Sequence, residues 1–214
     1  MSKLKKDKIQ PVEFNYVIAK ERPCWIDDDF TLEKMRENEF ARIRVFFHDN
    51  TPDQKSSARA ITLEQYGWAD KNKLQKILLD GFKKTHANYP ESLKKMNVKL
   101  ADVGLEKENW YETTSEKICL CTSGKKKIDK LFSHLRNVFA HSRFSIRSIE
   151  GKTDFIFIFE DAYTRKLKND KGIGQNEFDV SARMILKKTT LLKWIEIIES
   201  GERAFARQVS LCEK

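Results

Sequence analysis

The stretch Lys126–Phe159, KKIDKLFSHLRNVFAHSRFSIRSIEGKTDFIFIF, changes its hydrophobic period near its midpoint. Up to His141 the apolar residues recur at helical spacing and form a single stripe, which consists of Ile128, Leu131, Phe132, Leu135, Val138 and Phe139. From Phe144 to Ile149 apolar and polar residues alternate, which is typical of a half-buried strand. The Phe/Ile run at 154–159 is typical of a buried strand. The stretch therefore predicts a helix over 126–141 and then two strands joined by a turn.

Helical patterns dominate the rest of the chain. Apolar periodicity and capping residues predict helices at 29–48, 51–66, 74–82 and 90–103, and a last helix at 190–205. A third strand is predicted at 178–186, whereas 105–120 has no clear pattern. We therefore expect a mainly α protein with a small antiparallel β-sheet, the α+β class, in which a three-stranded meander is inserted before the last helix.

The composition fits one globular domain in the cytoplasm. The chain has 214 residues, and its 14 Phe and 4 Trp bring enough apolar area to offset chain entropy. No apolar run approaches the roughly 20 residues of a membrane-spanning helix, and the N-terminus lacks the apolar stretch of a secretion signal. We expect a basic arm at 1–10 and a single domain at 11–214, with the motif-bearing part at 125–205.

Charge and cysteine usage restrict the function further. The 41 Lys and Arg outnumber the 32 Asp and Glu, and the formal net charge is +9. A surplus of this size favours a polyanionic partner. Four cysteines are too few for a disulfide scaffold in a chain of this length.

The helix at 126–141 carries a polar face opposite its apolar stripe. At about 100° per residue, this face consists of Ser133, Arg136, Asn137, Ala140 and His141. Its centre is made of small residues, which allow a second backbone to approach closely. We therefore expect a two-fold homodimer in which the motif helices meet at this face.

The segment Leu135-Arg136-Asn137-Val138-Phe139-Ala140-His141 resembles the R-x4-6-H signature of the HEPN superfamily. The string Leu-Arg-Asn-x-x-Ala-His, placed before a short sheet and a closing helix, is similar to one branch of that superfamily. The resemblance implies an HEPN-like helical bundle, a homodimer with both motif helices at one cleft, and an endoribonuclease that needs no metal or other cofactor. We expect a toxin or defence effector in a microbial cytoplasm, with RNA and an antitoxin or regulatory protein as its partners.

The implied roles agree with the chemistry of the side chains. His141 is the acid/base, because a histidine gains and loses protons near neutral pH. Arg136 is the phosphate clamp, because its planar guanidinium can hold two phosphate oxygens. Asn137 is expected to orient His141 or to hydrogen-bond the RNA. Products would carry a 2′,3′-cyclic phosphate and a 5′-hydroxyl.

This sequence departs from the family pattern at two positions. Many members of the branch have Gly after the motif His, and Ser142 stands there. Arg143 occupies the position of the Tyr in the His-x-Tyr variant, which argues against pairing with a nucleotidyltransferase antitoxin. Two alternatives remain open: a catalytically inactive HEPN module that binds RNA or a protein, and a plain surface Arg beside a helix C-terminal His.

Four further residues are candidates for auxiliary RNA contacts. Arg143 follows the motif closely, Lys126 and Lys127 precede its helix, and His134 shares a face with Asn137. We expect no metal site. Cys119 and Cys121 lack the spacing of paired zinc ligands, and Glu160-Asp161 is more typical of acids in a turn at a strand end than of metal ligands. The four tryptophans are not spaced like a base-stacking platform, and we expect them in the core.

Overall fold

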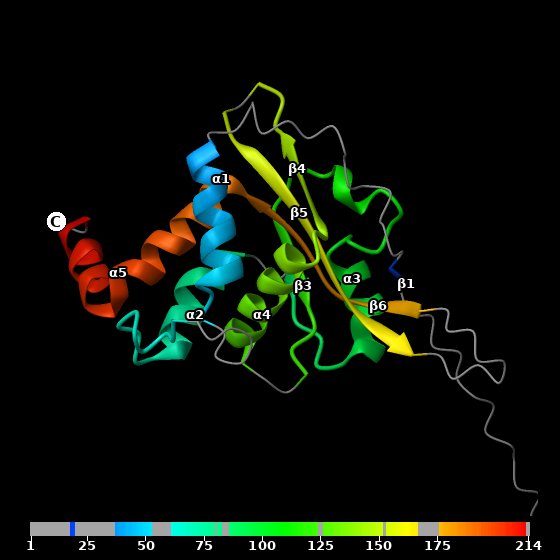
Figure 1. Cartoon of the computed structure of the whole chain (residues 1–214), viewed down its shortest axis with the longest axis horizontal. Coiled ribbons are helices and arrows are strands. Elements are labelled where there is room, and N and C mark those ends of the chain that lie inside the picture. The colour runs from blue at the N-terminus through cyan, green and yellow to red at the C-terminus, as the bar shows by residue number, and fades with distance from the viewer. Residues whose placement is uncertain are drawn as a thin grey trace, which may run out of the picture.

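The computed structural model describes residues 18–19, 37–52, 61–79, 81–82, 86–123, 126–151, 153–166 and 176–212. The α-helices are α1 (Glu37–Arg44), α2 (Lys71–Leu79), α3 (Met96–Asp102), α4 (Lys127–Ala140) and α5 (Lys188–Cys212). A π-helical turn η2 (Val45–Asp49) continues α1, and two 3-10 turns are η3 (Leu93–Lys95) and η4 (Trp110–Glu112). The strands are β1 (Ile18–Ala19), β2 (Ala87–Asn88), β3 (Lys117–Leu120), β4 (Phe144–Ser148), β5 (Phe155–Lys166) and β6 (Asn176–Lys187). Figure 1 shows their arrangement.

The strands form one mixed sheet in the order β2-β3-β6-β5-β4. The short β1 pairs antiparallel with Phe178 and Asp179, near the N-terminal end of β6. The predicted meander is present, because β4, β5 and β6 pair antiparallel in sequence order and α5 follows. The sheet is nevertheless larger than the three strands predicted. β3 pairs antiparallel with β6, and β2 pairs parallel with β3. These added strands have two to four residues, too few to show an alternating pattern in the sequence.

Side-chain alternation along β5 divides the core into two parts. Phe155, Phe157 and Phe159 belong to the larger cluster, which contains the apolar residues of α2, α4 and α5. Ile156 and Ile158 belong to a smaller cluster with residues of α3 and η4. Figure 1 shows α1, α2, α4 and α5 on one side of the twisted sheet and α3 on the other. The α+β class is therefore confirmed, with a central sheet covered on both faces.

The helix predictions hold where the periodicity is strong. The stripe of α4 is buried, and α2, α3 and the closing helix overlap the predicted segments, although α2 ends at Leu79 and leaves Gly81 and Phe82 outside the helix. The prediction at 51–66 is wrong where it can be checked: Thr51 and Pro52 are not helical, and 62–67 is a turn in which Trp68 N–H donates to the Leu63 carbonyl. Residues 53–60, the start of the 29–48 helix, the arm at 1–10 and Trp25 lie outside the described residues. The other three tryptophans are buried as predicted.

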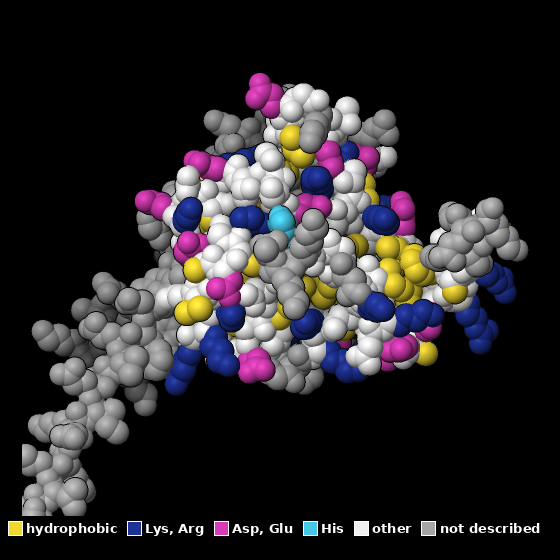
Figure 2. All heavy atoms as spheres, turned by 180° about the vertical axis from the view of Figure 1, so that it is seen from behind, with side chains coloured by type: hydrophobic (Ala, Val, Ile, Leu, Met, Phe, Trp, Pro, Cys, Tyr) yellow, Lys and Arg dark blue, Asp and Glu magenta, His cyan; other side chains and the backbone are white. Residues whose placement is uncertain are grey.

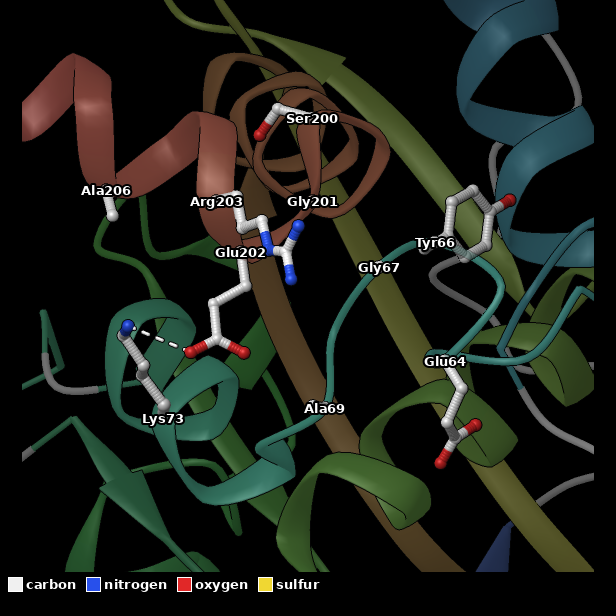
Figure 3. Close-up of a pocket in the computed structure, with 10 residues that line it drawn as sticks. All are labelled: Glu64, Tyr66, Gly67, Ala69, Lys73, Ser200, Gly201, Glu202, Arg203 and Ala206. Carbon is white, nitrogen blue, oxygen red and sulfur yellow. Dashed lines mark hydrogen bonds and ion pairs between the residues drawn. The ribbon is translucent and has the colours of Figure 1, made fainter.

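Helix α5 is broken at Gly201, which adopts φ 73° and ψ 164°, a region that is nearly exclusive to glycine. A Cβ at this position would lie 2.7 Å from the Tyr66 carbonyl oxygen. The Ile198 carbonyl, released from the helical ladder, accepts a hydrogen bond from Trp68 Nε1 at 3.0 Å. The break therefore packs the end of α5 against the turn at 62–68, as Figure 3 shows.

Candidate functional site

Helix α4 ends in a Schellman motif that places the last motif residue. The Val138 carbonyl accepts from Arg143 N–H at 2.8 Å, and the Phe139 carbonyl accepts from Ser142 N–H at 3.4 Å. Ser142 adopts φ 51°, the left-handed conformation that this motif requires and that glycine adopts most easily. Glycine would meet this backbone requirement without strain, and this chain meets it with a serine.

The polar face of α4 lies off the core, as the helical angles predict. Ala140 and His141 are exposed, whereas Ser133, Arg136 and Asn137 are half-buried. Ser133 Oγ donates to the Asp129 carbonyl one turn earlier, at 2.9 Å. The described part of the chain therefore leaves the exposed end of this face accessible to a ligand or to a second copy.

Asn137 is anchored by a residue of the sheet. Its Nδ2 donates to Asp161 Oδ2 at 3.1 Å, and His134 Nδ1 lies 2.6 Å from the same oxygen. His134 Nε2 lies 3.1 Å from the Cys121 carbonyl oxygen. The side chains of His134 and Asp161 are 0% and 2% exposed. His134, predicted as an auxiliary RNA contact, is therefore a buried partner of Asp161 and cannot reach RNA from this position.

Arg143 is also buried rather than available to phosphates. Its Nε donates to the Glu160 carbonyl at 3.1 Å, and its Nη2 donates to Glu160 Oε1. Glu160 Oε2 accepts from Arg183 Nε at 2.9 Å, and the Arg183 guanidinium lies 4.9 Å from the centre of the Trp110 ring. The predicted phosphate contact is thus engaged in an Arg–Glu–Arg cluster under the α3 side of the sheet.

The prediction that Glu160 and Asp161 lie in a turn at the end of a strand is wrong. The strand β5 continues past them to Lys166. As consecutive strand residues they face opposite sides of the sheet, and each is buried against a cation or an amide. The available signal was the alternation of 155–159, which when continued places Asp161 on the side of α4.

The predicted lysine contacts lie at the other end of α4. Lys126 and Lys127 are exposed, and Lys127 Nζ lies 4.2 Å from the centre of the Tyr89 ring. The helical rise places them roughly 20 Å from His141. In Figure 2, Lys and Arg side chains are frequent along the lower edge of the molecule, interspersed with Asp and Glu. Lys126 and Lys127 are therefore separated from Arg136 and His141 by most of the length of α4.

Two hollows in the described structure lie away from α4. One of about 700 Å³ surrounds the break in α5, and Figure 3 shows the Lys73–Glu202 ion pair, at 2.9 Å, on its wall. Accepting the Lys73 hydrogen bond lowers the pKa of the half-buried Glu202 carboxyl. The other hollow, of about 460 Å³, lies between α2 and α5. The polar face of α4 is therefore not a wall of either hollow.

Burial changes the acidity of two side chains near the sheet. It raises the pKa of the Cys119 thiol to about 12. Burial, followed by the charge of Asp161, also raises the pKa of Tyr163. Among the described residues, no group of three or more His, Cys, Asp or Glu side chains is arranged to hold a metal ion.

Comparisons of this chain with protein-family models, with curated proteins and with solved structures find no match. In the part of the chain that the structure describes, every helix is too short or too polar to cross a membrane.

Proposed function

We propose that the polar face of α4 is the active site of an HEPN-type endoribonuclease. One observation carries the proposal: a helix buried along its apolar stripe presents Ala140 and His141 at its exposed end, with Arg136 and Asn137 half-buried one turn earlier. The succession of α4, a meander and a closing helix supports the resemblance. Arg136, Asn137, Ala140 and His141 all lie outside the two apolar clusters of the core.

The proposed chemistry uses the RNA's own 2′-hydroxyl as nucleophile. His141 removes its proton, the oxygen attacks the adjacent phosphorus, and the bond from phosphorus to the 5′-oxygen breaks. The leaving 5′-oxygen takes up a proton from the His141 imidazolium or from water, which completes the acid/base cycle. Arg136 neutralises the charge that builds on the phosphorane oxygens. The products are a 2′,3′-cyclic phosphate and a 5′-hydroxyl, and the reaction requires no divalent metal.

The proposed assembly is a two-fold dimer through the same face. Each copy would then bring an Arg136/His141 pair to one groove, and the small Ala140 and Ser133 side chains would allow the helices to approach. Light scattering at tens of micromolar should show a dimer. The proposed biological role is that of a toxin or defence effector controlled by a regulatory protein.

The test uses total RNA in EDTA with wild-type protein, His141→Ala and Arg136→Ala. We expect cleavage by the wild type and a loss of about 100-fold or more in each variant, the size of an acid–base contribution. Arg136→Lys should also be poor, because Lys lacks the bidentate fork. Asn137→Ala should be milder. Cleavage of DNA at a comparable rate, or a strict need for Mg²⁺, would refute this mechanism.

A second candidate is a catalytically inactive HEPN module that binds RNA or a protein. The burial of Arg143 and His134 favours it, because two of the cations predicted for the site are engaged inside the fold. Equal background cleavage by wild type and His141→Ala, together with retained RNA binding, would establish this alternative.

A further inference from the structure

Beside their apolar contact, α4 and β5 are linked by three polar side chains in a row. Asp161 Oδ2 accepts from Asn137 Nδ2 at 3.1 Å and lies 2.6 Å from His134 Nδ1. Asp161 Oδ1 accepts from the Ala162 N–H at 3.0 Å. Only Asn137 among the three side chains is half-buried, and the other two are fully enclosed. The row therefore leads from the interior to the motif face.

The hydrogen bonds of this row favour one arrangement of its protons. The Cys121 carbonyl only accepts, so His134 Nε2 carries a hydrogen. The Asp161 carboxyl accepts from both Asn137 and Ala162, and such bonds favour its ionised form. An ionised carboxylate requires a donor at His134 Nδ1. In this arrangement both ring nitrogens of His134 donate, and the residue forms a buried imidazolium–carboxylate pair with Asp161.

We propose that Asp161, paired with His134, is a positioning residue for Asn137. It holds the Asn137 carboxamide with its oxygen turned away from β5, where this oxygen is a fixed acceptor for the ribose 2′-hydroxyl. The inference rests on the proposed function of Arg136 and His141. Because the carboxylate demands a donor, it selects one of the two orientations of the carboxamide. A fixed acceptor beside the reacting ribose discriminates RNA from DNA before any bond is broken.

The energetics of buried ion pairs support a role beyond stability. Two apolar side chains in place of a buried pair are often as stable, because desolvation of the charges offsets their attraction. Apolar substitutes at 134 and 161 would leave Asn137 Nδ2 without this acceptor. Orientation of Asn137 is thus a property that only the polar pair supplies.

The neighbouring residue provides a matched control. Glu160 is buried on the same strand and is also ion-paired, but it faces the α3 side and contacts Arg143 and Arg183. Glu160→Gln therefore disturbs a buried carboxylate of β5 without touching Asn137. Asp161→Asn disturbs the buried carboxylate that contacts Asn137.

The first experiment measures single-turnover RNA cleavage for Asp161→Asn, Asn137→Ala, the double variant and Glu160→Gln, with folding checked by circular dichroism. We expect a loss of about 10-fold in each of the first two, the value of one oriented hydrogen bond. The double variant should lose no more than Asn137→Ala alone, and Glu160→Gln should stay within about twofold of wild type. Additive losses, or an unchanged Asp161→Asn, would overturn the proposal.

The second experiment needs no activity and so separates this proposal from the proposed function. Nitrogen NMR at neutral pH should show both His134 ring nitrogens protonated in the wild type. The Asn137 side-chain amide should exchange slowly in wild type and Glu160→Gln and rapidly in Asp161→Asn. A neutral His134 ring or an unprotected Asn137 amide in the wild type would overturn the proposal, and these wild-type readings decide it even where Asp161→Asn fails to fold.

Discussion

Glu160 and Asp161 are consecutive residues of β5 and both are buried, yet their carboxyl groups have different kinds of partner. Glu160 binds two guanidinium groups, which stay charged under all conditions in which proteins fold. Asp161 binds an imidazole and a carboxamide. The α3 face of the sheet is therefore closed by permanent charges, whereas the α4 face carries a titratable group linked to a half-exposed helix surface. The difference suggests structure on one face and function on the other.

The comparison predicts that the Glu160 face is the more costly one to disrupt. Glu160→Ala leaves two buried guanidinium groups without their counter-charge and should reduce the free energy of unfolding by about 3–5 kcal/mol. Asp161→Asn places an amide nitrogen in the position of Oδ2, where a neutral His134 Nδ1 can accept from it, so a smaller loss of about 1–3 kcal/mol is expected. Urea denaturation followed by circular dichroism measures both. A greater loss for Asp161→Asn would reverse the assignment of the two faces.

A second prediction tests how well the α3 face excludes water. Cys119 belongs to the cluster on this face, and burial raises the pKa of its thiol to about 12, from an ordinary value of 9.0. Only the thiolate reacts with iodoacetamide, so Cys119 should react about 1000-fold more slowly in the folded protein than in urea. Mass spectrometry of the labelled peptide measures the ratio.

The same shift has a consequence for stability at alkaline pH. The folded state holds the thiol proton more tightly than the unfolded state, so this stabilisation is complete below pH 9 and is lost as the pH rises toward about 12. In Cys119→Ala this part of the alkaline decline should be missing.

For the labelling experiment, rapid reaction of Cys119 with iodoacetamide in the native protein would show that the α3 face opens.

The two faces were not equally predictable from the sequence. Helix α4 and the meander follow from periodicity, because their apolar stripes are long enough to show a repeat. The cover of the α3 face was predicted only in part, because the helix at 90–103 shows an apolar repeat whereas η4 with Trp110 lies in 105–120, where the sequence has no clear pattern. Because the sequence does not show that cover, it predicts Arg143 as an exposed cation. A polar residue on a strand cannot be assigned to water or to a buried partner until its opposite layer is known.

The candidate site shows the same limit. The positions of Arg136, Asn137 and His141 on one side of α4 follow from 100° per residue, and the structure agrees. The link from Asn137 to Asp161 depends on the register between α4 and β5, which no local pattern encodes. Alternation alone indicates the side of the sheet on which Asp161 lies and leaves its partner open.

The smallest predicted effect concerns the turn that joins the two faces, between the exposed His141 and the buried Arg143. Ser142 holds φ 51° there, which costs a non-glycine residue about 1–2 kcal/mol. Glycine removes that cost but loses about 0.5–1 kcal/mol of chain entropy on folding. Ser142→Gly should therefore raise the free energy of unfolding by about 0.5 kcal/mol, as measured by urea denaturation. Ser142→Ala is the matched control, because it keeps the strained φ and removes only the hydroxyl. Stabilisation by Gly with no gain from Ala assigns the effect to the backbone. A loss of stability in both variants would show instead that the Ser142 hydroxyl, and not relief of backbone strain, decides the stability of this turn.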